Sequence, residues 1–354
     1  MTTSPGPQNI GFRYGTSQSS LTSTVYYYGG IYDAGGNYSV SVTGLAESTT
    51  YYYQAFMDVW DGSKYVTLES GIQSFTTKQS AATASLGYLT CYEVPEVSTS
   101  GSMASGNEAT NRGYQWYRFR TDNANRAVAT HTYMDNSKKV RNYTVMLDGS
   151  KKAPLWTAHA MHASMWADNN VGRNDGWTDD PAFTGLGSWQ QSGVSGYSKG
   201  HLVASNYRQT IVAQNKQTFY HSNQAPQNQD FNGGIWNKLE DKVKAAAPSG
   251  RDTLYVVTGV LYEGTAQYSG GIQIPSHFYK CLLKCTFNTN GVMTAAKGCA
   301  YVFTNQSGHT NDASALPDYQ CTIDAVEQRA GFDFFPRVPS DLQVTAEKTK
   351  TTLW

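Results

Sequence analysis

Three short segments carry most of the residues suited to chemistry: YSKGHLVAS at 197–205, FYHSNQAPQ at 219–227 and DFNGGIWNKLE at 230–240. In the first segment a histidine follows a lysine and a glycine. Lysine can hold a phosphate group, histidine can accept a proton near neutral pH, and glycine allows a close backbone approach. Taken alone, this segment is weak evidence, because a structural histidine is the commoner case.

The third segment opens a predicted helix over residues 233–247. Apolar residues recur along one face of that helix, at Ile235, Leu239 and Val243. The helix is expected to end before Pro248, and one role for Asn232, at its start, is an N-cap. Asn232 and Glu240 would be about 12 Å apart along the axis, too far for one ion to touch both. A hydrated Mg²⁺ near Asn232 could still be reached by Glu240 through water.

Together, in this order and at this spacing, the segments resemble the DNA/RNA non-specific endonuclease family of the ββα-metal, or His-Me finger, nucleases. The family motifs are Asp-Arg-Gly-His, Ser-Asn-x-x-Pro-Gln and Asn-x-x-x-Trp-x-x-Leu-Glu. They match residues 198–201, 222–227 and 232–240. The resemblance spans roughly residues 90–340. It implies an α+β fold class, with a ββα-metal nuclease domain built on a central, mostly antiparallel sheet.

The resemblance also implies the roles of the site residues. His201 is the general base that takes a proton from the attacking water, and Asn223 supports the site. Asn232 is the direct ligand of Mg²⁺, with Mn²⁺ as the alternative metal. Glu240 holds waters of that metal.

Two further residues, Arg173 and Lys199, are placed against the phosphate by the same resemblance. The chain departs from the family at two positions, where Ser198 replaces an aspartate and Lys199 replaces an arginine. Lysine is a point charge and cannot grip a phosphate through two parallel hydrogen bonds. We therefore expect an active but altered site. Arg208, shortly after the first segment, either aids phosphate binding or braces its loop.

The implied function is a Mg²⁺-dependent, sugar-non-specific endonuclease that hydrolyses phosphodiester bonds of DNA and RNA and leaves a 5′-phosphate. This reaction needs a base for water, a cation on the leaving oxygen and positive donors around the phosphate. Two alternatives stay open. One is a catalytically weakened nucleic-acid or polyanion-binding protein on the same scaffold. The other is an adhesion or docking protein that acts through its N-terminal module.

Residues 1–78 form a separate all-β module in this interpretation. A turn over residues 44–50, followed by Tyr51 at the start of a strand, resembles the tyrosine corner of β-sandwiches. The module resembles a fibronectin type III-like β-sandwich, followed by a linker over 79–89 and the nuclease domain over 90–354. Within the nuclease domain, the patterns predict strands over residues 141–148, 154–161, 217–222 and 252–259.

Charge is low and balanced across the whole chain. Lys+Arg and Asp+Glu number 27 each, and charged residues make up 15%. Residues 111–354 hold 24 basic and 19 acidic residues, an excess that fits a polyanionic partner and is also within ordinary scatter. No apolar run approaches the roughly 18 residues that a membrane-spanning helix needs.

Five cysteines, an odd number, leave at least one thiol free. We expect some of the others to form disulfides in an oxidising compartment, with a connectivity that the sequence leaves open. The first residues have neither the basic nor the apolar stretch of a signal peptide. The expectation is a secreted, periplasmic or cell-surface protein whose signal peptide is not part of this chain. Its oligomeric state and its preference between DNA and RNA stay open.

Overall fold

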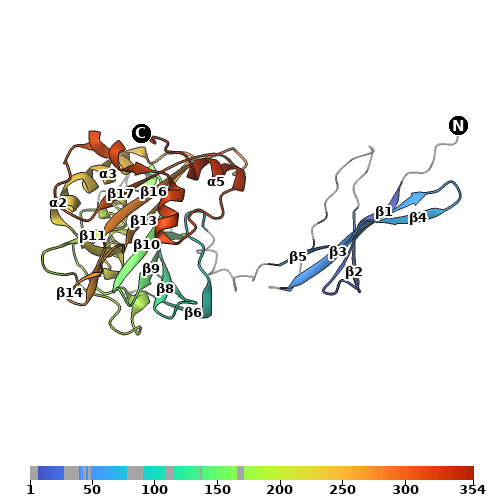
Figure 1. Cartoon of the computed structure of the whole chain (residues 1–354), viewed down its shortest axis with the longest axis horizontal. Coiled ribbons are helices and arrows are strands. Elements are labelled where there is room, and N and C mark those ends of the chain that lie inside the picture. The colour runs from blue at the N-terminus through green and yellow to red at the C-terminus, as the bar shows by residue number, and fades with distance from the viewer. Residues whose placement is uncertain are drawn as a thin grey trace. The chain divides into compact units, whose positions relative to one another are not determined.

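The computed structural model describes residues 7–27, 40, 42, 45–46, 49–77, 91–107, 115–135, 138–165 and 171–354. The chain divides into two compact units, residues 1–84 and 85–354, and each is described by itself (Figure 1). The assignment of 1–78, 79–89 and 90–354 to a β-sandwich, a linker and a nuclease domain stays a prediction.

The described strands of the first unit form one antiparallel sheet. Its order is β2-β1-β3-β4, and β5 also pairs with β3. The strands are β1 (Gln8–Gly15), β2 (Ser23–Tyr26), β3 (Thr50–Trp60), β4 (Tyr65–Glu69) and β5 (Gln73–Thr76). The hydroxyl of Tyr51 accepts a hydrogen bond from the backbone N–H of Ala46 at 2.9 Å, a contact of the kind a tyrosine corner makes. The fibronectin type III-like sandwich stays a prediction, because the described strands here form a single layer.

A nine-stranded sheet dominates the second unit. Its order is β18-β17-β16-β13-β10-β9-β8-β7-β6, and every neighbouring pair is antiparallel. The strands are β6 (Thr99–Asn107), β7 (Gln115–Thr121), β8 (Arg126–Asp135), β9 (Lys138–Asp148), β10 (Ala153–Met161), β13 (Thr253–Leu261), β16 (His277–Phe287), β17 (Met293–Thr304) and β18 (Gln320–Cys321). Two shorter strands, β14 (Gln267–Ser269) and β15 (Ile272–Ile274), form a hairpin outside it. The large antiparallel sheet with few helices confirms the predicted α+β class.

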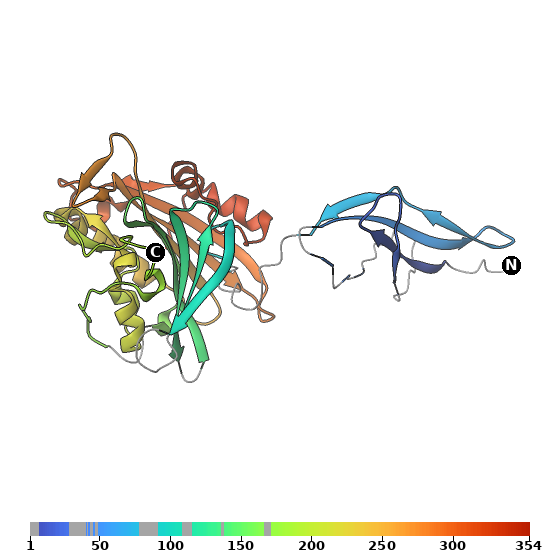
Figure 2. The same ribbon diagram turned by 90° about the horizontal axis from the view of Figure 1, so that it is seen from below.

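The central strands are buried on both faces, because successive residues enter two different cores. In β13, Leu254 and Val256 pack in the core shared with helix α3 (Asn237–Ala246). Tyr255 and Val257 pack in the core closed by α4 (Ile323–Ala330) and α5 (Ser340–Glu347). Figure 2 shows the yellow α3 and the red α4 and α5 on opposite sides of the strands. None of the helices in the described ranges is long and apolar enough to cross a membrane.

The prediction of a strand over residues 217–222 is wrong. Residue 217 ends helix α1 (Val212–Gln217), a turn follows, and His221–Asn223 is a short 3₁₀ turn, η5. The backbone N–H groups of Thr218 and Phe219 donate to carbonyls of the preceding turn, so this stretch continues helical bonding. Thr218, Phe219 and Tyr220 are buried one after another in this turn, so their β-branched and aromatic side chains serve packing and not a strand.

The helix predicted over 233–247 begins earlier and is not uniform. A short helix, α2 (Gln229–Phe231), leads into a π-helical segment, η6 (Asn232–Trp236), and then into α3. The N-cap is Asn228, whose side chain accepts from the N–H of Phe231. The N-cap role considered for Asn232 is therefore wrong.

The expected disulfides are absent, because all five cysteines, each of them within the described residues, are free thiols. The register of β16 and β17 explains why. Cys299 lies opposite Leu282, so it faces the other side of the sheet from Cys281. Cys281 and Cys321 share a face but lie two strands apart, about 10 Å, beyond the roughly 7 Å that a disulfide spans.

Candidate active site

A hairpin and a helix bring the predicted site residues together. Strands β11 (Ser198–His201) and β12 (Gln224–Gln227) pair antiparallel, and the chain continues from β12 into α2 and α3. The result is a ββα arrangement on the α3 face of the sheet. Five of the six predicted site residues line one polar pocket there: Arg173, Lys199, His201, Asn232 and Glu240.

His201 lies at an aromatic wall of this pocket. Its ring centroid is 4.7 Å from that of Trp177 and 5.0 Å from that of Phe219. Burial, with a smaller effect of the positive charge on Arg173, lowers the pKa of His201 to about 3. The imidazole is therefore neutral near pH 7. Its Nε2 is buried and has no hydrogen-bond partner among the described residues.

The residue before this histidine lies against a buried side chain. A Cβ at Gly200 would lie 2.3 Å from Oε1 and 2.6 Å from Cβ of the buried Gln227, so a larger residue here would displace Gln227. Asn223 does not line the pocket. Its amide nitrogen donates to the carbonyls of Val203 at 3.0 Å and Thr218 at 2.8 Å, and its oxygen accepts from the N–H of Val203 at 2.9 Å. Asn223 thus braces the backbone that follows His201.

Asn232 and Glu240 also line the pocket. Both are half-buried. Burial raises the pKa of Glu240, and the positive charges of Lys280 and Arg173 oppose that rise. Lys280 is fully buried, donates to Thr258 Oγ1 at 2.9 Å and lies 4.8 Å from the ring centroid of Trp236. An amide oxygen and a carboxylate in a polar pocket are donors that suit Mg²⁺, which keeps several of its waters.

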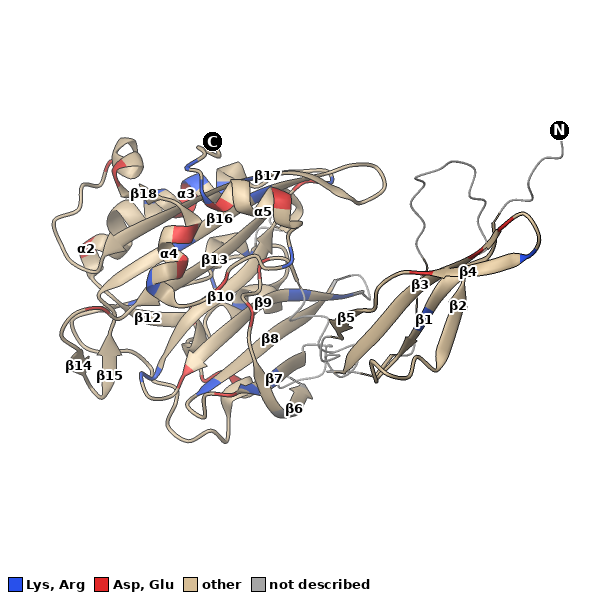
Figure 3. Ribbon diagram, turned by 45° about the vertical axis from the view of Figure 1, so that its right-hand side comes forward, with Lys and Arg blue, Asp and Glu red and all other residues tan. Residues whose placement is uncertain are grey.

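Another group of carboxylates lies on the far face of the sheet. Oxygens of Asp324, Glu327 and Glu347, on α4 and α5, lie within 4.8 Å of one another, and Figure 3 shows these acidic helices. Burial raises the pKa of Glu327 to about 7 and that of Glu347 to about 8. This group is separate from the pocket around His201.

Two cations complete the pocket. The guanidinium of Arg173 lies 5.1 Å from the ring centroid of Phe219, donates to Ser205 Oγ at 3.2 Å and pairs with Asp175. Its side chain is 55% exposed, so it can meet an anion in solution. The Nζ of Lys199 lies 5.3 Å from the ring centroid of Trp177. Trp177 therefore touches both Lys199 and His201, a role that its position in the sequence does not reveal.

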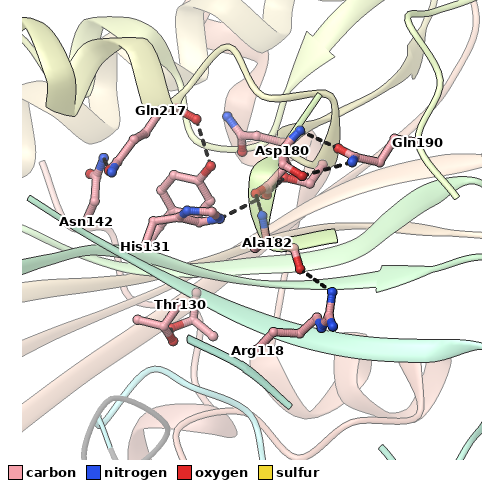
Figure 4. A network of polar contacts seen from close by, with 12 residues as sticks. Arg118, Thr130, His131, Asn142, Asp180, Ala182, Gln190 and Gln217 are labelled. Carbon is pink, nitrogen blue, oxygen red and sulfur yellow. Dashed lines mark hydrogen bonds and ion pairs between the residues drawn. The ribbon is translucent and has the colours of Figure 1, made fainter. Parts of the chain in front are cut away.

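A buried network fixes the loop that carries Arg173 and Trp177 (Figure 4). Oδ2 of Asp180 accepts from His131 Nε2 at 2.9 Å and from the hydroxyl of Ser222, and Oδ1 accepts from the N–H of Ala182 at 2.8 Å. Gln190 binds the backbone of Asp180 through both atoms of its amide group. His131 belongs to β8, so this network ties the loop to the sheet. The sequence analysis did not predict this network. The Asp180-Pro181 pair is its one local signal in the sequence.

Arg208 braces the loop and does not face the pocket. It is fully buried, and its Nε donates to Asn142 Oδ1 at 2.6 Å. Its Nη2 donates to the backbone oxygens of Asn142 and Ala160, both at 3.1 Å. Of the two roles considered for this arginine, the structure supports bracing.

Comparison with known proteins identifies a family and several relatives. The model of the DNA/RNA non-specific endonuclease family matches residues 121–341. A nuclease of Nostoc sp. is 27% identical over 232 residues, which are 64% of this chain and 82% of that protein. The nuclease of Serratia marcescens is 24% identical over 213 residues, 57% of this chain and 76% of that protein.

Similarity extends to mitochondrial proteins. Nuclease EXOG of Mus musculus is 26% identical over 218 residues, and the match spans 57% of each chain. A solved structure of an EndoG/EndoGI complex has 24% identity and a TM-score of 0.48, covering 60% of this chain and 88% of that one. Since the family model matches more than half of the chain, the protein belongs to the DNA/RNA non-specific endonuclease family.

Proposed function

We propose that the protein is a Mg²⁺-dependent endonuclease that hydrolyses DNA and RNA, with His201 as its general base. One observation carries this proposal. A neutral histidine, whose buried Nε2 has no hydrogen-bond partner within the described ranges, lines a pocket that it shares with an amide, a carboxylate and two cations. This set matches the needs of phosphodiester hydrolysis.

In the proposed reaction, His201 Nε2 takes a proton from a water molecule. The water oxygen forms a bond to phosphorus, and the bond between phosphorus and the 3′ oxygen breaks. Arg173 and Lys199 stabilise the negative charge that grows on the phosphate oxygens. Asn232 would hold the metal through its side-chain oxygen, and Glu240 would hold metal-bound waters. A divalent cation bound there supplies Lewis-acid stabilisation of the leaving oxygen.

The test is digestion of plasmid DNA and of total RNA by the purified protein with Mg²⁺, with EDTA, and after His201→Ala. We expect both substrates to be degraded with Mg²⁺, and neither by the variant or in EDTA. A salt-sensitive gel shift without cleavage, with Mg²⁺ or Mn²⁺, would instead support the catalytically weakened binding protein. A secreted, periplasmic or cell-surface location is proposed as well, on composition alone, since the free thiols remove the disulfide argument.

A further inference from the structure

A second polar pocket adjoins the first. It is lined by Asn174, Asp175, Gly176, Thr178, Lys216 and Tyr220. The ion pair between Arg173 and Asp175 separates the two, because Arg173 lines the pocket of His201 and Asp175 lines this one. The two pockets are therefore neighbours across this ion pair.

This second pocket has a rigid frame. The N–H of Asn174 donates to Oδ1 of the buried Asn215 at 3.0 Å. Thr178 donates its N–H to the carbonyl of Phe219 at 3.2 Å and accepts at its carbonyl from the N–H of His221 at 3.0 Å. Shortly after Thr178, the network around Asp180 ties the loop to the sheet (Figure 4). Little ordering of the protein is then needed when a ligand binds.

The charge of this pocket favours an anion. The side chain of Lys216, on the last turn of α1, is exposed, and its ammonium group makes no hydrogen bond or ion pair in the part of the chain that the structure describes. The single carboxylate of the lining, Asp175, is paired with Arg173. Hydroxyl and amide groups of Thr178 and Asn174 add polar contacts of the kind that sugar and phosphate oxygens make.

We propose that this second pocket is the subsite for a phosphate that neighbours the scissile one, with Lys216 as its cation. The inference rests on the proposed nuclease function, since a nucleic-acid strand then passes over Arg173. Such a contact fixes the register of the strand without reading its sequence. Affinity, and not the chemical step, should depend on Lys216.

The test uses single strands with one phosphodiester linkage, all other linkages being phosphorothioates, which keep their charge and resist cleavage. In companion strands one neighbouring linkage is a neutral methylphosphonate. We expect Lys216→Ala to lower kcat/KM about fivefold on the charged strand, through KM. Lys216→Ala should have no effect on one of the companion strands, the one whose neutral linkage would occupy the second pocket. In that strand the negative charge that Lys216 contacts is already missing. Lys216→Arg should restore activity, and Lys348→Ala, an exposed lysine at the end of α5, should match the wild type.

Binding of the same strands in EDTA, followed by fluorescence anisotropy across salt concentrations, needs no turnover. Lys216→Ala should reduce the slope of log Kd against log salt by about 0.7. An unchanged slope and unchanged kcat/KM would overturn the proposal, as would a loss that is equal whichever linkage is neutral. Failure of the wild type to cleave would count against the nuclease function, while the binding measurement would still decide the role of Lys216.

Discussion

Replacing Asp180 by asparagine tests whether the buried network holds the loop of Arg173 and Trp177. The carboxylate accepts three hydrogen bonds, from His131, Ser222 and the backbone of Ala182. The side chains of Asp180 and His131 are both 0% exposed, so water cannot replace a lost contact. An asparagine keeps one oxygen that can accept hydrogen bonds. Its amide nitrogen takes the place of the other carboxylate oxygen and faces a group that itself donates, so that hydrogen bond is lost.

The magnitude follows from these contacts. A hydrogen bond to a charged group contributes about 1.5–3 kcal/mol, and breaking a buried pair costs about 3–5 kcal/mol. Since one oxygen keeps its contacts, we expect Asp180→Asn to lower the free energy of unfolding by about 3 kcal/mol. The nuclease activity should fall as well, because Arg173 and Trp177 lose their support.

Urea unfolding followed by tryptophan fluorescence measures this loss. Trp60 is the only tryptophan in residues 1–84, so the signal reports mainly on the second unit. The neighbouring Asp179 supplies a matched control, because its side chain is 70% exposed and pairs with His221. Asp179→Asn should cost less than about 1 kcal/mol. Equal losses in the two variants, or a loss below about 1 kcal/mol for Asp180→Asn, would refute the reasoning.

Three more outcomes follow from the site. Lys199→Arg should raise kcat/KM on plasmid DNA, because a guanidinium grips phosphate through two hydrogen bonds; unchanged or lower turnover would contradict the view that lysine is the weaker clamp. The pKa of folded His201, about 3, is below its unfolded value near 6.5, so the folded state loses stability as the pH falls below about 6.5. Between pH 7 and pH 5, urea unfolding in EDTA should show a drop about 1–2 kcal/mol larger for the wild type than for His201→Gln, and equal drops would contradict this pKa. Gly200→Ala should lower the free energy of unfolding by about 1–3 kcal/mol, because its Cβ would overlap the buried Gln227; a urea midpoint equal to that of the wild type would show that Gln227 can move aside.

Much of the fold was predictable from local patterns. Apolar runs predicted the central strands β9, β10 and β13, because strands buried on both faces carry such runs. The same reasoning failed for the stretch 217–222, because a buried helical turn can carry the β-branched and aromatic residues that are typical of a strand. The prediction of disulfides was wrong because the spacing of cysteines along the chain does not show which face of a sheet each one occupies.

The residues that hold the site in place are harder to predict from the sequence than the residues proposed to take part in the reaction. His201, Asn232 and Glu240 stand in motifs with a fixed spacing, so a resemblance can identify them. His131 comes from a strand about 50 residues before Asp180, and nothing local marks the two as partners. The same holds for Trp177, which contacts Lys199 and His201 although it lies more than 20 residues before them in the sequence.

The two departures from the family motif have different consequences, because side chains alternate along β11. Lys199 and His201 both line the pocket, whereas Ser198 and Gly200 do not. Ser198 lies opposite Gln227 in the hairpin, so a change from aspartate at this position alters the support of the strand. The change from arginine to Lys199 alters the pocket itself. We therefore expect a weaker hold on the phosphate, while His201 stays neutral.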